Sequence, residues 1–294
     1  MDGIVLSGGG SKGSWQVGVL QYLASSCRYP EGFQMVAGTS VGAINACAIA
    51  AFPPDERQLH LSSYLMSRAW RGIRATSDIW RHRIPPIISG AFTPSIGRTE
   101  PLRKLLSKTI NLKSILGSGV KLRIAATDLL SGSQRIFTEK DDIVRSVMAS
   151  AAFPMIFPPE IMGNSYFSDG AIREVAPIGS IVKEGCERIL VLACRDPDRS
   201  YPVGTGDLKG VLGIGVRVLD IMQQEMLRNE LRLVEYTNRL VRAGAAPIEK
   251  RDVEVTTVFP STPLADPLDF EPETIRQQMA QGFQDAKRRF ECPT

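Results

Sequence analysis

Residues 3–23 read GIVLSGGGSKGSWQVGVLQYL, an apolar run that leads through a glycine-rich loop into a helical pattern. Residues 3–7 predict a buried strand, and residues 14–24 predict a helix because Val17, Leu20 and Leu23 recur on one helical face. The loop between them has three consecutive glycines and reads Gly8, Gly9, Gly10, Ser11, Lys12, Gly13. Such a loop can hold a phosphate group or the oxyanion of an acyl-transfer reaction, and the rest of the chain has to distinguish the two.

Strand-like and helical stretches alternate along the remaining chain, which predicts an α/β protein with a mainly parallel central sheet. Further strands are expected at residues 35–37, 121–126, 134–138, 166–168, 188–193 and 253–259. Further helices are expected at residues 43–52, 142–152, 208–243 and 272–290. The weakest boundary lies at residues 199–213, but a strand and a closing helix follow it. We therefore expect a single domain over residues 1–294.

The composition excludes several classes of protein. Hydrophobic residues make up 43% of the 294, which is ordinary for a globular chain with a sizeable core. A net charge of +4 is too small to indicate nucleic-acid binding, and five cysteines without a CxxC pair predict neither a disulfide framework nor a metal site. No apolar run approaches the ~18 residues of a membrane span, and no basic leader precedes the first strand. We expect a cytoplasmic or peripheral membrane protein, which is also compatible with secretion by a route that uses no cleaved leader.

Residues 38–42 read GTSVG and lie between a short apolar run and a helix of small residues. In this context the GxSxG pattern is typical of a nucleophile elbow, whose tight turn leaves no room for bulky side chains at Gly38 and Gly42. Ser40 would lie at a helix N-terminus, where unpaired N–H groups favour negative charge. Ser40 is therefore the candidate nucleophile, and a turn of small residues that only packs is the alternative.

The glycine loop also matches the GxGxxG pattern of dinucleotide sites. Those sites need an acidic residue at the end of the next strand, but that strand runs into GTSVG and Glu31 precedes it. For acyl transfer the loop supplies backbone N–H donors, so Gly8, Gly9 and Gly10 are the candidate oxyanion hole. Ser11 is a further candidate donor, and Lys12 is either a brace of the loop or a surface charge. A non-catalytic nucleotide-, phosphate- or lipid-binding protein remains the alternative function.

A serine nucleophile needs a base, and the two histidines are poorly placed to supply it. His60 and His82 both lie in a basic segment away from the predicted strand ends. Asp169 directly follows the strand predicted at residues 166–168 and precedes Ala171 by way of Gly170, which allows a sharp turn. Burial in an apolar pocket would raise the pKa of this carboxyl and make it a better base. An ordinary Asp-Gly hairpin turn is the alternative.

The glycine loop, GTSVG and the Asp169-Gly170-Ala171 tripeptide together resemble the three signatures of the patatin-like phospholipases, in that family's order. The resemblance covers about residues 3–171, and DGA in place of DGG is within the family's pattern. It implies a Ser–Asp dyad of Ser40 and Asp169 on a three-layer α/β/α sandwich, a variant of the hydrolase theme. It also implies cleavage of fatty acyl esters in phospholipids or lysophospholipids, with no metal or other cofactor.

Residues 56–116 differ from the rest because they are basic, partly helical and interrupted by proline, so we interpret them as a helical insertion or cap. Tryptophan beside arginine is typical of segments at a membrane surface. The candidate membrane contact is therefore Trp70, Arg71, Trp80 and Arg81, and a solvated basic face is the alternative. A homodimer or an activating partner is compatible with the long helix expected at residues 208–243.

Overall fold

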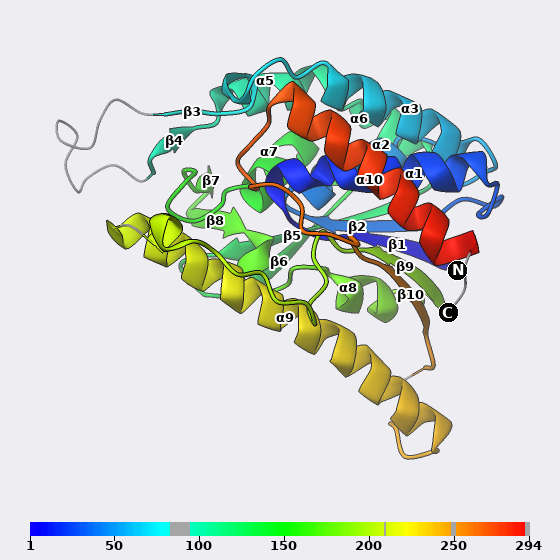
Figure 1. The fold of residues 1–294 in the computed structure, drawn as a ribbon. Coiled ribbons are helices and arrows are strands. Elements are labelled where there is room, and N and C mark those ends of the chain that lie inside the picture. Colours follow the sequence, from blue (N-terminus) through cyan, green and yellow to red (C-terminus); the bar gives the residue numbers. More distant parts are fainter. Residues whose placement is uncertain (83–94, 209, 248–250, 292–294) are drawn as a thin grey trace.

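The computed structural model describes residues 1–82, 95–208, 210–247 and 251–291, and a mixed β-sheet forms its centre (Figure 1). Within these residues the strand order is β10-β9-β1-β2-β5-β8-β7, with β6 also paired to β5. The parallel strands are β1 (Asp2–Leu6), β2 (Met35–Thr39), β5 (Lys121–Asp128), β9 (Arg188–Leu192) and β10 (Glu254–Val258). The antiparallel edge consists of β6 (Gln134–Thr138), β7 (Glu160–Met162) and β8 (Ser165–Asp169).

The central strand β1 is apolar because both of its faces are covered. Ile4 and Leu6 belong to the core above the sheet, and Val5 belongs to the core below it, as the two-residue period of a strand requires. Parallel strands covered on both faces have near-continuous apolar sequences. The register places Val5 between Ala37 of β2 and Val191 of β9.

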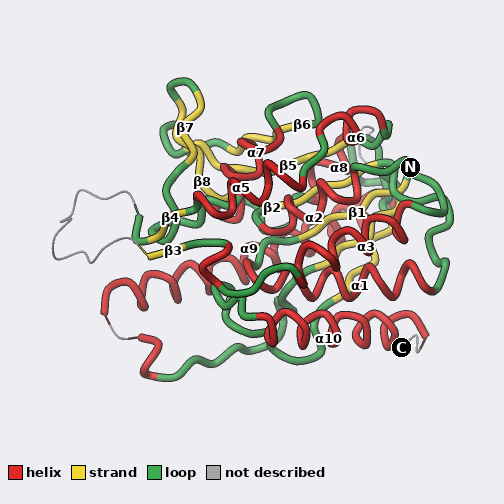
Figure 2. The backbone as a smooth tube through the Cα atoms, turned by 90° about the horizontal axis from the view of Figure 1, so that it is seen from above, coloured by secondary structure: helices red, strands yellow, loops and turns green. Residues whose placement is uncertain are grey.

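The upper layer of helices is built around α1 (Gly13–Ser25), α10 (Pro272–Glu291) and α3 (Gln58–Arg71), which lie side by side over the sheet in Figure 2. Helices α1 and α10 approach closely because Gly18 and Gly282 face the partner backbone, where a Cβ would clash with the carbonyls of Met279 and Trp15. The same layer contains α2 (Val41–Ala50), α5 (Glu100–Thr109), α6 (Leu112–Gly117) and α7 (Ile143–Ser150) (Figure 1).

The lower layer consists of α8 (Ile178–Lys183) and the long α9 (Gly210–Arg242), whose C-terminal end extends beyond the sheet in Figure 1. Leu227 of α9 is buried in the lower core, and Ile181 of α8 packs in the same cluster. The three-layer α/β/α sandwich with a mainly parallel sheet, which the sequence predicted, is confirmed. The strand β7 and the helix α8 were missed because each is too short to show a periodic pattern.

Residues 56–116 contain α3, the short turn η2 (Thr76–Asp78), the antiparallel pair of β3 (Arg81–His82) and β4 (Gly97–Arg98), and then α5 and all but the last residue of α6. Helix α3 packs against α1 and α2, so it is part of the upper layer. Residues 83–94 of this predicted insertion lie outside the described residues.

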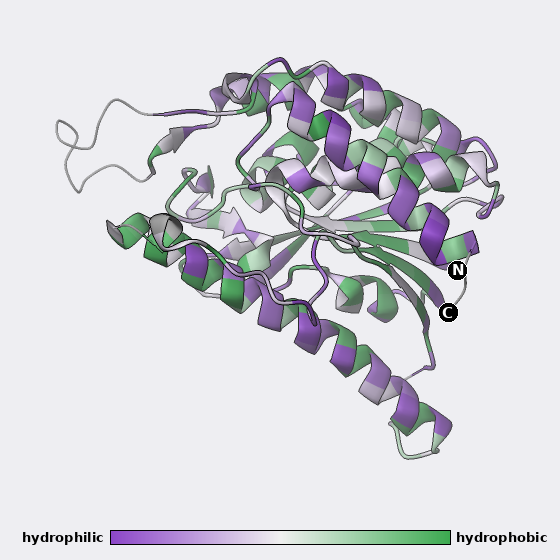
Figure 3. Ribbon diagram, viewed as in Figure 1, coloured by the Kyte–Doolittle hydropathy of each residue, from purple (hydrophilic) through white to green (hydrophobic). Residues whose placement is uncertain are grey.

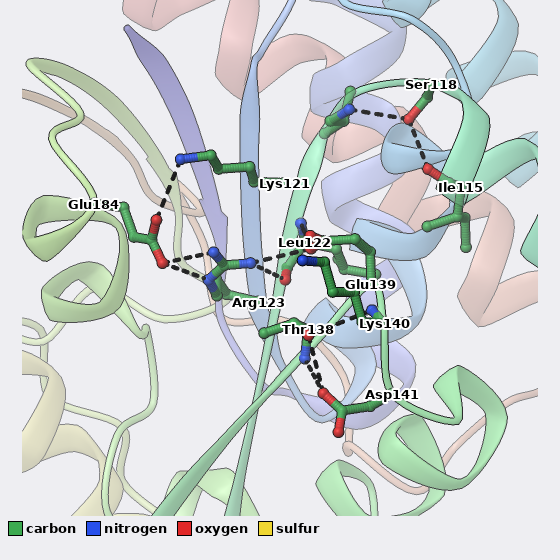
Figure 4. A network of polar contacts seen from close by, with 11 residues as sticks. Ile115, Ser118, Lys121, Leu122, Arg123, Thr138, Glu139, Lys140, Asp141 and Glu184 are labelled. Carbon is green, nitrogen blue, oxygen red and sulfur yellow. Dashed lines mark hydrogen bonds and ion pairs between the residues drawn. The ribbon is translucent and has the colours of Figure 1, made fainter.

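A polar network around Arg123 ties β5 to the lower layer (Figure 4). The Arg123 guanidinium is buried and pairs with Glu184 at 2.6 Å and with Glu139 at 3.1 Å. Glu184 follows α8, and Lys121 adds a second cation beside it at 3.3 Å. These cations hold the pKa of the Glu184 carboxyl below its usual range, with Arg123 the larger cause.

No helix in the described part of the chain is both long and apolar enough to cross a bilayer. Across the same residues, no group of histidine, cysteine, aspartate and glutamate side chains could hold a metal ion. Cys27, Cys47, Cys186 and Cys194 are free thiols, and Cys292 lies outside the described residues.

Candidate active site

Ser40 forms the sharp turn between β2 and α2. Its φ of 56° and ψ of −126° are strained for a residue with a side chain. The strain is held by Ser150, whose Oγ accepts the Ser40 N–H at 2.8 Å and donates to the Ala125 carbonyl at 2.6 Å. The motifs did not single out Ser150, because it comes from α7, more than a hundred positions away in the sequence.

The glycines beside Ser40 allow backbones to approach closely. A Cβ on Gly38 would clash with the Gly42 carbonyl, and a Cβ on Gly42 would clash with the Leu6 carbonyl at the end of β1. A Cβ on Gly13 would clash with the Val41 side chain, so the start of α1 packs against the turn that contains Ser40. Gly170 lies against the Ala125 carbonyl, which brings the end of β8 to this point.

Asp169 is the last residue of β8 and is buried. Its Oδ1 accepts the Ala171 N–H at 2.8 Å, whereas its Oδ2 is enclosed and has no hydrogen-bond partner in the described part of the chain. Burial raises the pKa of Asp169 from 3.8 to about 7, and the Ala171 N–H and the Ser40 hydroxyl oppose that rise. The carboxyl is therefore close to half-ionised at neutral pH.

The Ser40 hydroxyl is near enough to the Asp169 carboxyl to lower its pKa. Oδ2 nevertheless has no partner within hydrogen-bonding distance in the described part of the chain. Loose contacts of this kind are common in enzymes without substrate and tighten in the reacting complex. Neither His60 nor His82 forms a described hydrogen bond to Ser40 or Asp169. His82 packs edge-on against Trp80, with ring centroids 4.6 Å apart.

Two of the predicted oxyanion donors in the glycine loop already donate hydrogen bonds to backbone carbonyls, so they are not available to a substrate. The Gly8 N–H donates to the Val175 carbonyl at 3.1 Å, and the Ser11 N–H donates to the Pro267 carbonyl at 2.8 Å. Both groups are occupied because distant segments cross the loop. Within the described residues, the N–H groups of Gly9 and Gly10 have no protein acceptor.

Gly8 and Gly10 have steric reasons to lack a side chain. A Cβ on Gly8 would lie 3.3 Å from the Ser40 Cβ, so Gly8 is in contact with the candidate nucleophile. Gly10 has a φ of +59° and faces the Pro267 carbonyl, with which a Cβ would clash.

Ser40, Asp169 and Gly8–Gly10 line one cavity of about 850 Å³, a size typical of ligand sites. Its walls are mainly apolar and come from both helical layers. They include Trp70, Trp80, Leu102, Leu106, Phe157 and Phe270. Lys12, interpreted from sequence as a loop brace or a surface charge, also lines this cavity.

The predicted membrane contact is wrong for both tryptophans. Trp70 is 6% exposed and donates its Nε1–H to Asn45 Oδ1 at 3.1 Å, and Trp80 is 7% exposed and packs edge-on against Phe157. Their rings form the cavity wall, because burying large aromatic surface there is more favourable than leaving it in water. Arg71 and Arg81 are exposed.

A sequence model of the family described as patatin-like phospholipase matches residues 4–182, a range that contains the glycine loop, the elbow and Asp169. The chain belongs to the patatin-like phospholipase family. The resemblance indicated by the three motifs is thereby confirmed, and the patatin-like chain is a member of a family of lipid acyl hydrolases.

Solved structures similar to the patatin-like chain include VipD from Legionella pneumophila, at 13% identity and a TM-score of 0.45 over 98% of this chain and 66% of VipD. The type III effector ExoU is similar at 16% identity and a TM-score of 0.42, over 97% of this chain and 51% of ExoU. ExoU of Pseudomonas aeruginosa in complex with SpcU is similar at 18% identity and a TM-score of 0.35, over 79% of this chain and 52% of that one. The patatin-like chain thus spans about two thirds of VipD and half of ExoU.

Proposed function

We propose that this chain is a phospholipase A or lysophospholipase that cleaves fatty acyl esters with Ser40 as nucleophile and Asp169 as base. The observation that carries the proposal is the buried, unpaired Asp169 Oδ2 in the cavity that Ser40 lines. An unpaired buried carboxyl oxygen is unfavourable unless a ligand or a reacting group completes it. Its raised pKa also suits a base that works near neutral pH.

In the proposed reaction, Ser40 Oγ attacks the ester carbonyl carbon while Asp169 Oδ2 takes the hydroxyl proton. The Gly9 and Gly10 N–H groups donate to the developing oxyanion. Asp169 then gives the proton to the glycerol oxygen of the leaving group, which departs as a lysophospholipid or, when the substrate is itself a lysophospholipid, as a glycerophosphodiester. A water molecule, deprotonated by Asp169, attacks the acyl-enzyme and releases the fatty acid.

The proposed enzyme must reach a substrate in a bilayer, and we assign the peripheral membrane contact to the first half of α9. Val211, Ile214 and Val218 are exposed at helical spacing on this segment, and Val211 is 90% exposed. Between residues 210 and 224 the only charged residues are Arg217 and Asp220, which pair with each other at 2.5 Å. Leu212 and Val216 of the same turns line the cavity, so the apolar stripe continues into the site that would accept the acyl chain.

The test is to react the protein and its Ser40→Ala variant with a fluorophosphonate that carries a long alkyl chain, with and without anionic liposomes. Labelling of the wild type alone, followed by release of fatty acid from phospholipid, is the expected result. Absence of labelling in both conditions would contradict the proposal. Saturable heat on calorimetric titration with a dinucleotide, without labelling, would instead favour the non-catalytic alternative.

A further inference from the structure

Glu230 lies on α9, and its carboxyl group binds two backbone N–H groups of the segment that follows the turn after Asp169. Its Oε1 accepts the Val175 N–H at 2.7 Å, and its Oε2 accepts the Ala176 N–H at 2.9 Å. Burial raises the pKa of the Glu230 carboxyl to about 8, and the two N–H groups oppose that rise because they favour the ionised form. The ionised carboxylate is therefore the better partner for this segment.

The two N–H groups belong to consecutive peptide units whose carbonyls bind the active site. The Val175 N–H shares its peptide unit with the Glu174 carbonyl, which accepts the Thr39 hydroxyl at 3.1 Å. The N–H and C=O of a planar trans peptide point in opposite directions. This unit is therefore bound by Glu230 at one end and by the residue before Ser40 at the other.

The second peptide unit binds the glycine loop in the same way. The Ala176 N–H shares its unit with the Val175 carbonyl, which accepts the Gly8 N–H at 3.1 Å. A Cβ on Gly8 would lie 3.3 Å from the Ser40 Cβ, so this contact also reaches the candidate nucleophile. Hydrogen bonds in a chain polarise one another and become stronger. Loss of the Glu230 carboxyl would therefore weaken both attachments of this segment to the active site.

We propose that Glu230 is a positioning residue, which holds the turn before Ser40 and the glycine loop in the geometry that oxyanion binding requires. The inference rests on the proposed function and assigns part of the rate to a residue of α9 that is not among the described residues lining the cavity. The Gly9 and Gly10 N–H groups would bind the substrate oxygen most strongly when it becomes an oxyanion. Glu230 should therefore contribute to kcat and leave KM nearly unchanged.

The first measurement compares the wild type with Glu230→Gln on a soluble acyl ester at pH 9, where Glu230 and Asp169 are both ionised. Glutamine keeps the size of the side chain, but it has one acceptor oxygen and turns an NH2 group toward the second N–H. We expect kcat to fall about tenfold, the effect of one hydrogen bond to a charged group, and KM to change less than about twofold. Glu235→Gln, an exposed glutamate on the same helix, is the matched control and should equal the wild type.

The second measurement separates positioning from folding. A long-chain trifluoromethyl ketone accepts Ser40 Oγ at its carbonyl carbon while Asp169 takes the hydroxyl proton, so the ketone oxygen becomes an oxyanion. The alcohol of the same chain contacts the same apolar wall and forms no oxyanion. In Glu230→Gln the inhibition constant of the ketone is expected to rise about tenfold, whereas that of the alcohol stays the same, because only the ketone uses the glycine-loop donors.

Thr39→Val removes the hydroxyl that binds the Glu174 carbonyl, and it provides a second variant in case Glu230→Gln does not fold. Its kcat should fall by a smaller factor. When both substitutions are combined, the loss should be smaller than the product of the two single losses, because both act through one peptide unit. Multiplied losses would contradict that shared route.

Equal rises in the two inhibition constants would overturn the inference and leave Glu230 as a structural acceptor of two N–H groups. An unchanged kcat in the folded variants would overturn it as well. If the wild type neither hydrolyses the ester nor binds the ketone more tightly than the alcohol, the proposed function fails and the inference fails with it. An active wild type that Glu230→Gln equals in both measurements contradicts the inference alone.

Discussion

Asp169 is the base in the proposed reaction, and its acid–base properties come from its surroundings. A solvent-exposed aspartate is too weak a base for a serine hydroxyl at neutral pH. Enclosing the carboxyl, with only the Ala171 N–H bound to one oxygen, raises its pKa to about 7. The single carboxyl thereby acquires the basicity that a histidine usually provides, although His82 also lines the cavity.

The first prediction concerns the pH dependence of kcat/KM. Asp169 must be ionised to take the proton from Ser40, so activity on a soluble ester should reach a plateau above pH ~7 and fall about tenfold per pH unit below it. Asp169→Asn should lose at least ~10³-fold, since an amide cannot accept the proton. A profile that stays flat down to pH 5 would show that another group is the base.

At the scale of elements, α9 has two different halves. The outer face of its first half is apolar, whereas its second half has charged residues such as Arg232, Glu235 and Arg239, and Figure 3 shows more hydrophilic colour toward this end. Among the described residues of α9, those that line the cavity lie between Leu212 and Leu227. The helix therefore combines a structural role under the sheet with an exposed apolar stripe beside residues that line the cavity.

The second prediction tests that stripe. Val211→Glu and Val218→Glu should each lower the ratio of phospholipid-vesicle hydrolysis to soluble-ester hydrolysis by about tenfold, because a charge on the stripe opposes insertion among lipid headgroups. Leu233→Glu is the matched control, since Leu233 is 65% exposed on the same helix but lies in the charged half. A similar drop in all three variants, measured with vesicle sedimentation alongside, would argue against a specific contact by the first half.

The third prediction concerns the link between β5 and the lower layer. Arg123→Met removes the shared partner of Glu139 and Glu184 and should lower the free energy of unfolding by about 3 kcal/mol. Arg135→Met breaks an exposed pair with Asp141 and should cost less than about 1 kcal/mol. Urea denaturation measures both, and equal effects would mean that burial of the Arg123 network contributes little.

At the scale of the whole molecule, the site is assembled from segments far apart in the sequence. The family match ends at residue 182, yet α9 and residues 263–270 complete the cavity. Pro267 accepts the Ser11 N–H, and Asp266 accepts the Ser11 hydroxyl, so this late segment also holds the glycine loop in place.

The fourth prediction concerns global stability. Because the pKa of Asp169 is about 7 in the folded protein and near 3.8 when exposed, the folded state keeps a proton that the unfolded chain loses between these values. Its stabilising contribution is complete below pH ~4 and falls by about 1.4 kcal/mol per pH unit up to pH ~7. The stability of Asp169→Asn relative to wild type should therefore rise by roughly 3 kcal/mol between pH 5 and pH 8.

Urea denaturation of both proteins at the two pH values provides the measurement. Glu230, whose pKa burial raises to about 8, contributes with the same sign to both proteins and cancels in the difference. A difference that does not change with pH would mean that Asp169 is ionised well below neutral pH.

The sequence alone determined the alternating α/β order, the sharp turn at Ser40 and the motif that identifies the family. These features are local: a strand, a turn and a helix start within five residues, so propensity and glycine spacing are enough to specify them. It also indicated Asp169, because the carboxyl follows a strand and precedes a turn.

Only the tertiary structure decided which groups in the loop are available. The Val175 carbonyl accepts the Gly8 N–H, and the Pro267 carbonyl accepts the Ser11 N–H. Within the described residues, the N–H groups of Gly9 and Gly10 remain available to a ligand. The burial of Trp70 and Trp80 and the position of Lys12 in the cavity likewise depend on elements that are remote in the chain. The physical reason is that the hydrogen bonds of a group and its exposure to solvent depend on the residues packed around it. These residues come from distant parts of the chain, and a sequence motif does not identify them.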